Sequence, residues 1–268
     1  MENHQVIKLG AACLFDSEGR IDHPLLRQKA EEIKGIEEEQ NTISTLVVSG
    51  AIPVGKMMYD DRRPNEELTP EEMQFYAGVG QIGLMEAYGE AFKDIYNISQ
   101  LLITSKDTKE KEYMGHIKNL VNNSAEKGVI ILANRNDPVD FEQLTGQAGR
   151  AGPTDNETTS LDLALCCDSK RLVILGRYEG FLNPEGELIR EINGVTEEHY
   201  SMCNDGSSQK KQKNFGFYPK LYAADLLSKR GIDVMIGSVE RPLSSIVSGE
   251  YGTRFRMGHP DDALQKGG

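Results

Sequence analysis

Short, continuously apolar runs alternate with longer helical patterns along this chain of 268 residues. The runs lie near residues 5–9, 45–48, 99–103, 128–133, 171–175 and 233–236. Strands read this way when helices bury both faces of a mostly parallel sheet. We therefore expect an α/β protein, a three-layer αβα sandwich with a mostly parallel central sheet.

The bulk composition narrows the class of protein further. The length suits one large α/β domain, and 38% hydrophobic residues is ordinary for a globular chain. A net charge of −12 argues against a general nucleic-acid binder, because neutralising phosphates needs clustered cations. No apolar run approaches the roughly 20 residues of a membrane span, and no signal-type segment opens the chain. We expect a cytoplasmic protein without nucleic-acid or membrane partners.

The cysteines and histidines do not indicate a metal site. None of the four cysteines or five histidines has a partner at a metal-ligand spacing. The thiols are therefore expected to be reduced side chains of the interior: Cys13, Cys166, Cys167 and Cys203.

A helix with a well-marked start is expected from residue 70 to about residue 95. Thr69 is placed to cap it, Pro70 occupies its first position, and Glu72 completes a capping box. Each glycine inside a helix costs about 1 kcal/mol. The four within this one predict a kink or a close approach to another element or a ligand: Gly78, Gly80, Gly83 and Gly89.

Polar residues follow several of the expected strands, where an open α/β sheet holds its ligand. They include Lys8, the junctions 49–52, 134–137 and 155–157, and the distant Lys220. The two lysines could approach one phosphate from two sides, with Asp155 or Glu157 as the carboxylate between them. The amides of Gly10 and Ala11 could add neutral donors. Phosphoryl transfer needs this kind of positioning and positive charge, so the pattern predicts a phosphoryl-transfer enzyme.

The alternatives at these positions are structural ones. Taken singly, Lys8 reads as a snorkelling lysine and Lys220 as a solvated residue at a helix start. The chain has neither a P-loop nor a dinucleotide-binding glycine motif after its first strand. Ser49 does not lie in the motif of a hydrolase nucleophile, so a hydroxyl that orients a substrate is the favoured interpretation.

The order of these motifs resembles the amino-acid kinase superfamily and, within it, the glutamate 5-kinase family. The resemblance runs from Val6 to about Phe255. It rests on residues 7–10 (IKLG), 47–52 (VVSGAI), 79–85 (VGQIGLM), 134–137 (NRND), 154–157 (TDNE), 220–225 (KLYAAD) and 252–255 (GTRF). Many glutamate kinases carry a C-terminal RNA-modification-type domain, and this sequence stops before it.

The resemblance implies ATP-dependent phosphorylation of the side-chain carboxylate of L-glutamate, giving L-glutamyl 5-phosphate for proline biosynthesis. Lys8 and Lys220 would stabilise the transferring phosphoryl group. Asp155 and Glu157 would form the acid cluster that orients the lysines and Mg²⁺. The glutamate would be bound by Ser49, Asn134, Asp137 and Asn156.

The nucleotide side departs from the family pattern. The resemblance assigns nucleotide binding to Lys8, Gly10, Gly176, Arg177, Gly216 and Lys220. However, the family's loop Thr-Asp-x-x-Gly-Leu-Tyr reads GRYEGFL at residues 176–182, Ala11 replaces a hydroxyl residue, and Glu157 replaces an aspartate. Arg177 is expected either to pair with ATP phosphates or to mark a changed nucleotide site.

The resemblance also implies a domain organisation. Residues 1–257 would form the kinase domain, with an acceptor half to about residue 150, a nucleotide half from 151, and a tail at 258–268. The loop 138–154 would cover the acceptor and sense proline as a feedback inhibitor, and the protein would be a homo-oligomer. Two alternatives stay open. The chain could be a diverged homologue that binds an amino acid with little or no kinase activity, or a same-fold kinase for another small acid.

Overall fold

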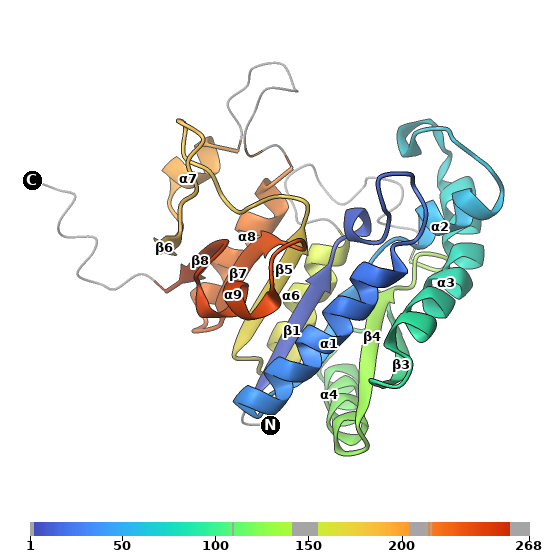
Figure 1. Cartoon of the computed structure of the whole chain (residues 1–268), viewed down its shortest axis with the longest axis horizontal. Helices are drawn as coiled ribbons and strands as arrows, with labels where there is room; N and C mark the ends of the chain where they lie inside the picture. Colours follow the sequence, from blue (N-terminus) through green and yellow to red (C-terminus); the bar gives the residue numbers. More distant parts are fainter. Residues whose placement is uncertain (1–2, 109, 141–154, 204–213, 215, 258–268) are drawn as a thin grey trace, which may run out of the picture.

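The computed structural model describes residues 3–108, 110–140, 155–203, 214 and 216–257, with residues 155 and 156 described by their backbone alone. Its centre is an eight-stranded sheet in the order β3-β4-β2-β1-β5-β7-β8-β6 (Figure 1). Only the β7–β8 pair is antiparallel in this part of the chain. The prediction of an α/β protein with a mostly parallel sheet is confirmed.

All six expected strands are present, and two short ones were not expected. The strands are β1 (His4–Leu9), β2 (Ile43–Val48), β3 (Asn97–Ile103), β4 (Val129–Arg135), β5 (Arg171–Gly176), β6 (Glu191–Asn193), β7 (Asp233–Ser238) and β8 (Thr253–Arg256). In the centre of the sheet, Lys8 of β1 is aligned with Val47 of β2 and Ile174 of β5. The carboxyl ends of these three strands therefore lie at one edge, where the polar junctions were expected to meet.

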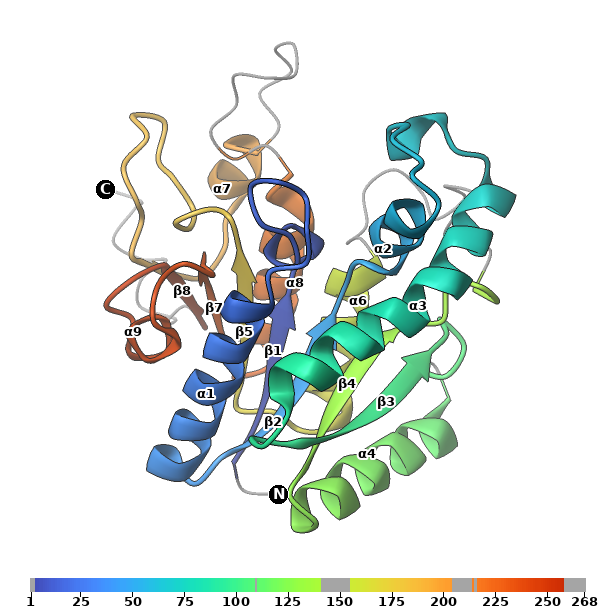
Figure 2. The same ribbon diagram turned by 45° about the vertical axis from the view of Figure 1, so that its right-hand side comes forward.

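Helices cover both faces of the sheet (Figures 1 and 2). One face carries α1 (His23–Gln40), α2 (Ala51–Met58), α3 (Pro70–Phe92) and α9 (Leu243–Ser248). The other carries α4 (Lys111–Glu126), α6 (Asp155–Cys166) and α8 (Tyr218–Ser228), and the short α7 (Glu197–Ser201) follows β6. Alternate residues of β1 serve the two cores, with Val6 facing α6 and Ile7 facing α1.

Helix α3 begins as its sequence predicts. The Thr69 side chain accepts from the Glu72 amide, and the Glu72 carboxylate accepts from the Thr69 amide, which confirms the capping box. The helix ends at Phe92, so the expected end near residue 95 was three residues too far. A Cβ on Gly80 would lie 1.9 Å from the carbonyl oxygen of Ala51 in α2. The sequence left open a kink or a close approach to another element or a ligand. At Gly80 the structure shows a close approach to another helix.

Helix α2 was not expected from the sequence. It starts directly after Gly50, whose φ of 121° favours glycine, and it contains both Pro53 and Gly55. The sequence of α2 has a weak helical propensity, so packing against α3 must stabilise the helix. Gly55 allows this packing, because it lets the backbone of Tyr76 in α3 approach closely. This packing places Ser49 in the short connection between β2 and α2.

None of the described helices combines the length and the hydropathy of a membrane span.

Candidate active site

Two lysines from distant parts of the sequence meet at one carboxylate. Lys8 Nζ forms a short ion pair with Glu157 Oε1, and Lys220 Nζ lies 3.2 Å from the same oxygen. The side chains of Lys8, Glu157 and Lys220 are only 7%, 3% and 16% exposed. Of the two carboxylates considered from the sequence, Glu157 therefore occupies the position between the lysines.

The secondary structure explains how these three side chains converge. Lys8 is the penultimate residue of β1, on the face that α6 covers. Glu157 and Lys220 lie in the first turns of α6 and α8. The first turn of a helix presents free backbone N–H groups and the positive end of the dipole, so it favours bound anions. Two ammonium groups and two helix starts thus surround one carboxylate.

Burial and charge shift the pKa values at this cluster in a consistent direction. Burial, together with the neighbouring Lys220 charge, lowers the pKa of Lys8 against the opposing effect of Glu157. Burial alone would raise the pKa of Glu157, but the two lysines outweigh it and hold that pKa below its ordinary value. Glu157 is therefore an anion held between the two lysines.

Other predicted residues line the same edge of the sheet near β2 and β4. Ser49 follows β2, and Asp137 comes two residues after β4 ends. Asn134 of β4 is buried, and its Nδ2 donates to Gln81 Oε1 of α3 at 2.8 Å. Gln81 belongs to the Gly-Gln motif but was not assigned to the site. The sequence feature that could have indicated a role for Gln81 is its place directly after Gly80, the glycine that lets α3 approach α2.

A second buried charge pair lies beside these residues and was not anticipated. Arg135 Nε lies 3.0 Å from Asp140 Oδ2, and their side chains are 1% and 6% exposed. Asp140 also accepts hydrogen bonds from the amide and hydroxyl of Ser105. Within the described residues, none of the three guanidinium nitrogens of Arg135 has a hydrogen-bond partner, so its contact with Asp140 is an ion pair alone. The pair closes the turn that carries Asn136 and Asp137 at the end of β4.

The predicted nucleotide residues are placed differently from one another. The Gly10 amide donates to the Leu175 carbonyl at 3.2 Å, so here it is not the free neutral donor that was expected. Arg177 donates to the Ala12 and Phe15 carbonyl oxygens and pairs with Glu240 at 3.0 Å. It therefore ties the loop after β1 to the ends of β5 and β7.

The remaining two predicted nucleotide residues lie beside the lysine cluster. Gly176 ends β5, and the Gly216 carbonyl oxygen accepts from Lys220 Nζ at 3.3 Å. The side chains of Asp155 and Asn156 lie outside the described residues, as does most of the loop 138–154. Their predicted roles, and the division into two halves near residue 150, stay predictions.

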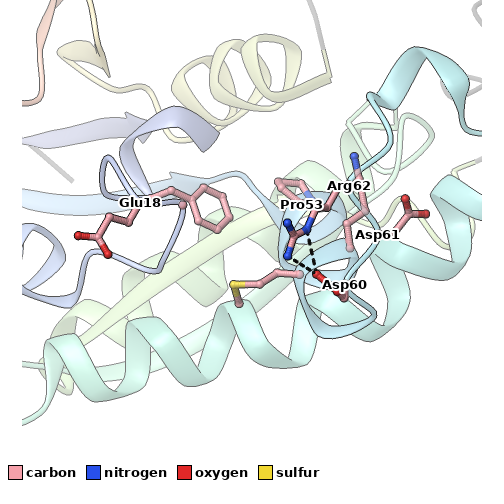
Figure 3. Close-up of a pocket in the computed structure, with 9 residues that line it drawn as sticks. Glu18, Pro53, Asp60, Asp61 and Arg62 are labelled. Carbon is pink, nitrogen blue, oxygen red and sulfur yellow. Dashed lines mark hydrogen bonds and ion pairs between the residues drawn. The ribbon is translucent and has the colours of Figure 1, made fainter.

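One cavity is lined by none of the residues of this cluster (Figure 3). It has a volume of about 580 Å³ and is bordered by Glu18 on one side and by Asp60, Asp61 and Arg62 on the other. Arg62 pairs with Asp60 across 3.1 Å within it. None of the predicted site residues lines it, so this cavity does not mark the lysine cluster.

The described residues do not form a protein cage for a metal ion. No group of three or more His, Cys, Asp or Glu side chains comes together within them. Glu157 is already engaged by two ammonium groups. Mg²⁺ is often held mainly by substrate phosphates with one or two carboxylates.

Comparison with solved structures shows which fold this chain has. The carbamate kinase from Giardia lamblia bound to citric acid matches with a TM-score of 0.62 at 17% identity, covering 95% of this chain and 98% of that one. The UMP kinase from Bacillus anthracis matches with a TM-score of 0.57 at 14% identity, covering 95% and 96%. At these identities the likeness shows the fold.

Sequence comparison identifies the family. The model of the amino acid kinase family matches residues 3–238, so this chain belongs to that family. Glutamate 5-kinase of Herpetosiphon aurantiacus is 31% identical over 94% of this chain and 67% of its own length. Glutamate 5-kinase of Clostridium perfringens is 27% identical over 93% of this chain and 94% of its own length. The resemblance stated from the motifs is confirmed, and the chain is a phosphotransferase of this family.

Proposed function

We propose that this protein transfers the terminal phosphoryl group of ATP to the side-chain carboxylate of L-glutamate, forming L-glutamyl 5-phosphate. The observation that carries the proposal is the meeting of Lys8 and Lys220 at Glu157. The curated relatives compared above, which bear the name glutamate 5-kinase, support the choice of acceptor.

The cluster suits the charge that moves in this reaction. The step breaks the bond between the terminal phosphorus of ATP and its bridging oxygen and forms a bond to a carboxylate oxygen. Negative charge gathers on the transferring group and on the leaving ADP. Lys8 and Lys220 would lie against this charge, and Glu157 would keep their ammonium groups oriented before the donor arrives.

A carboxylate acceptor also matches what the site offers. Such an acceptor is already ionised at neutral pH, so it needs alignment and positive charge rather than a general base. We propose that Ser49, Asn134 and Asp137 bind the glutamate, because they lie at the ends of β2 and β4. The Asp137 carboxylate would take the ammonium group, and hydroxyl and amide donors would take the α-carboxylate.

Mg²⁺ would enter this reaction with the nucleotide. Because Glu157 is held by both lysines, the nucleotide phosphates would be the main ligands of the ion. Bound to the phosphates, Mg²⁺ would neutralise part of their charge.

The direct test measures ADP release with glutamate, aspartate, N-acetylglutamate, carbamate and UMP as separate acceptors. Hydroxylamine is added in a parallel reaction, because it converts an acyl phosphate into a stable hydroxamate. We expect glutamate-dependent ADP release with matching hydroxamate formation. ADP release with carbamate or UMP but not glutamate would instead assign another acceptor, and no release with any of them would contradict kinase activity.

The substrate-side assignment has its own test. Asp137→Ala should raise the glutamate KM with a smaller effect on kcat, because it removes a binding contact. Asp140→Glu, which keeps a charge beside Arg135, serves as the neighbouring comparison. An Asp137→Ala variant with an unchanged glutamate KM would contradict the assignment.

A further inference from the structure

An aromatic ring lies beside the lysine that reaches Glu157 from α8. The ring centroid of Tyr178 is 5.6 Å from Lys220 Nζ, within the range of a cation–π contact. Among the described residues, this ammonium also contacts Glu157 Oε1 at 3.2 Å and the Gly216 carbonyl at 3.3 Å. Lys220 is thus held by a carboxylate, a carbonyl and an aromatic ring.

The ring itself is fixed by packing on two sides. Phe217, directly before α8, contacts it edge to face with centroids 5.7 Å apart. On another side lies Gly176, where an added Cβ would come within 2.2 Å of the Tyr178 ring. The ring therefore occupies the space that any side chain at position 176 would need.

This geometry gives the altered nucleotide loop a physical reason. The loop pattern of the glutamate 5-kinase family has a hydroxyl residue at the position of Gly176. The side chain of such a residue would collide with the Tyr178 ring in its present place. Gly176 and Tyr178 are therefore one structural feature. Burial, and secondarily the Glu157 charge, raise the pKa of Tyr178, so the phenol is neutral and its ring keeps a negative face toward the ammonium.

We propose that Tyr178 is a positioning residue whose ring holds the Lys220 ammonium against Glu157 and beside Lys8, with Gly176 kept free of a side chain to admit that ring. This proposal deepens the proposed function, on which its kinetic test rests. In this proposal the ring acts through its contact with Lys220 and not on the reacting atoms. Its loss should therefore affect turnover through Lys220 and leave acceptor binding nearly unchanged.

The kinetic test compares Tyr178→Phe with Tyr178→Leu. Tyr178→Phe keeps the ring and should retain kcat within about twofold, whereas Tyr178→Leu should lower kcat by about 5- to 30-fold, the range of a partly buried cation–π contact. The glutamate KM should change by less than about twofold in both variants. Tyr113→Leu, at an exposed position of α4, is the matched control and should leave kcat unchanged.

A double-mutant cycle tests the link to Gly176. Gly176→Ser should displace the ring and lower kcat about as much as Tyr178→Leu does. In the Tyr178→Leu background, the same serine should add little, because the ring is already absent. Additive effects would overturn the link.

A spectroscopic test needs neither nucleotide nor acceptor. The chain contains no tryptophan, so Tyr178→Trp introduces a single indole at this position. An ammonium close to an indole face quenches its emission. We expect Lys220→Met in this background to raise the emission, whereas Lys229→Met, at the far end of α8, should not.

The outcomes separate this proposal from the proposed function. An emission that responds to Lys220→Met supports the placement of the ring even if glutamate proves not to be the acceptor. An emission indifferent to Lys220→Met overturns the proposal even in an active glutamate kinase. A Tyr178→Phe variant as slow as Tyr178→Leu would also overturn it, because the hydroxyl would then be responsible. If Tyr178→Leu fails to fold, the Phe and Trp variants still decide.

Discussion

The Lys220 ammonium lies 3.2 Å from the Glu157 carboxylate oxygen that also pairs with Lys8. The lysines lie far apart along the chain, so this shared carboxylate joins the first strand to α8. Since both ammonium groups depend on one anion, Glu157 is the residue whose loss should disturb the cluster most.

Glu157→Gln should reduce both stability and turnover. The substitution leaves two buried ammonium groups beside a neutral amide, and removing one partner from a buried ion pair costs about 3–5 kcal/mol. Urea unfolding and ADP release measure the two effects. Glu240→Gln, which removes the exposed partner of Arg177, should change stability by less than about 1 kcal/mol. Similar stabilities for the two variants would contradict a buried cluster.

Gly80→Ala should destabilise the protein although alanine is the better helix former. The new Cβ would lie 1.9 Å from the Ala51 carbonyl oxygen, so α2 and α3 would have to separate. Overpacking of this kind costs about 1–3 kcal/mol. Gly115→Ala is the control at an exposed position of α4, where an added Cβ meets nothing within 4 Å, and it should stabilise by up to about 1 kcal/mol. Thermal unfolding of both variants measures the difference.

The α2–α3 contact also shows how far the sequence could predict the fold. The start of α3 was predictable, because Thr69 and Glu72 form its capping box within four residues. Helix α2 was not, because Pro53 and Gly55 weaken its local signal and packing on α3 maintains it. Strands β6 and β8 were not predicted for a related reason. They have only three and four residues, and pairing with neighbouring strands maintains them.

The candidate site, too, could be predicted from the sequence only in part. Position along the chain predicted that Lys8 and Lys220 could meet, because Lys8 lies at the end of a strand and Lys220 at the start of a helix, where an open α/β sheet holds its ligand. It could not choose between Asp155 and Glu157, since that depends on how α6 packs against β1. Neither could it place Arg177 against the Ala12 carbonyl, or Arg135 against Asp140, because these contacts depend on tertiary structure.

Stability should fall in mild acid because of His4. Burial lowers the pKa of His4 from 6.5 to about 4, and its ring nitrogens lie 2.7 and 2.9 Å from the hydroxyl oxygens of Ser169 and Thr45. The unfolded chain therefore binds a proton more readily between these two pH values. This contribution is fully present above pH 6.5 and is lost as the pH falls toward 4, amounting to about 2–3 kcal/mol by pH 4.5.

The measurement for His4 is urea unfolding at pH 7.5, 5.5 and 4.5. His4→Gln should show a weaker dependence on pH over this range, whatever its stability at pH 7.5. His116→Gln, at an exposed position of α4, should follow the unmodified protein. Equal slopes for His4→Gln and the unmodified protein would rule His4 out as the source.

Asp140→Asn should destabilise the turn after β4. It removes the charge that faces the buried Arg135 guanidinium, at a cost of about 3–5 kcal/mol. Adding Arg135→Met should recover part of this loss, because the unpaired charge is then gone. Asp168→Asn removes an exposed partner of Lys118 and should change stability by less than about 1 kcal/mol. A double variant less stable than Asp140→Asn alone would contradict this account.

The most direct measurement is the steady-state rate of glutamate-dependent ADP release in Lys220→Met beside Lys229→Met. Both lysines belong to the α8 region, but Lys229 is exposed and pairs with Asp225. We predict that Lys220→Met lowers kcat by at least about 100-fold with the glutamate KM within about threefold, while Lys229→Met keeps the original kcat. A Lys220→Met variant with the original kcat, or no glutamate-dependent release by the unmodified protein, would contradict the account.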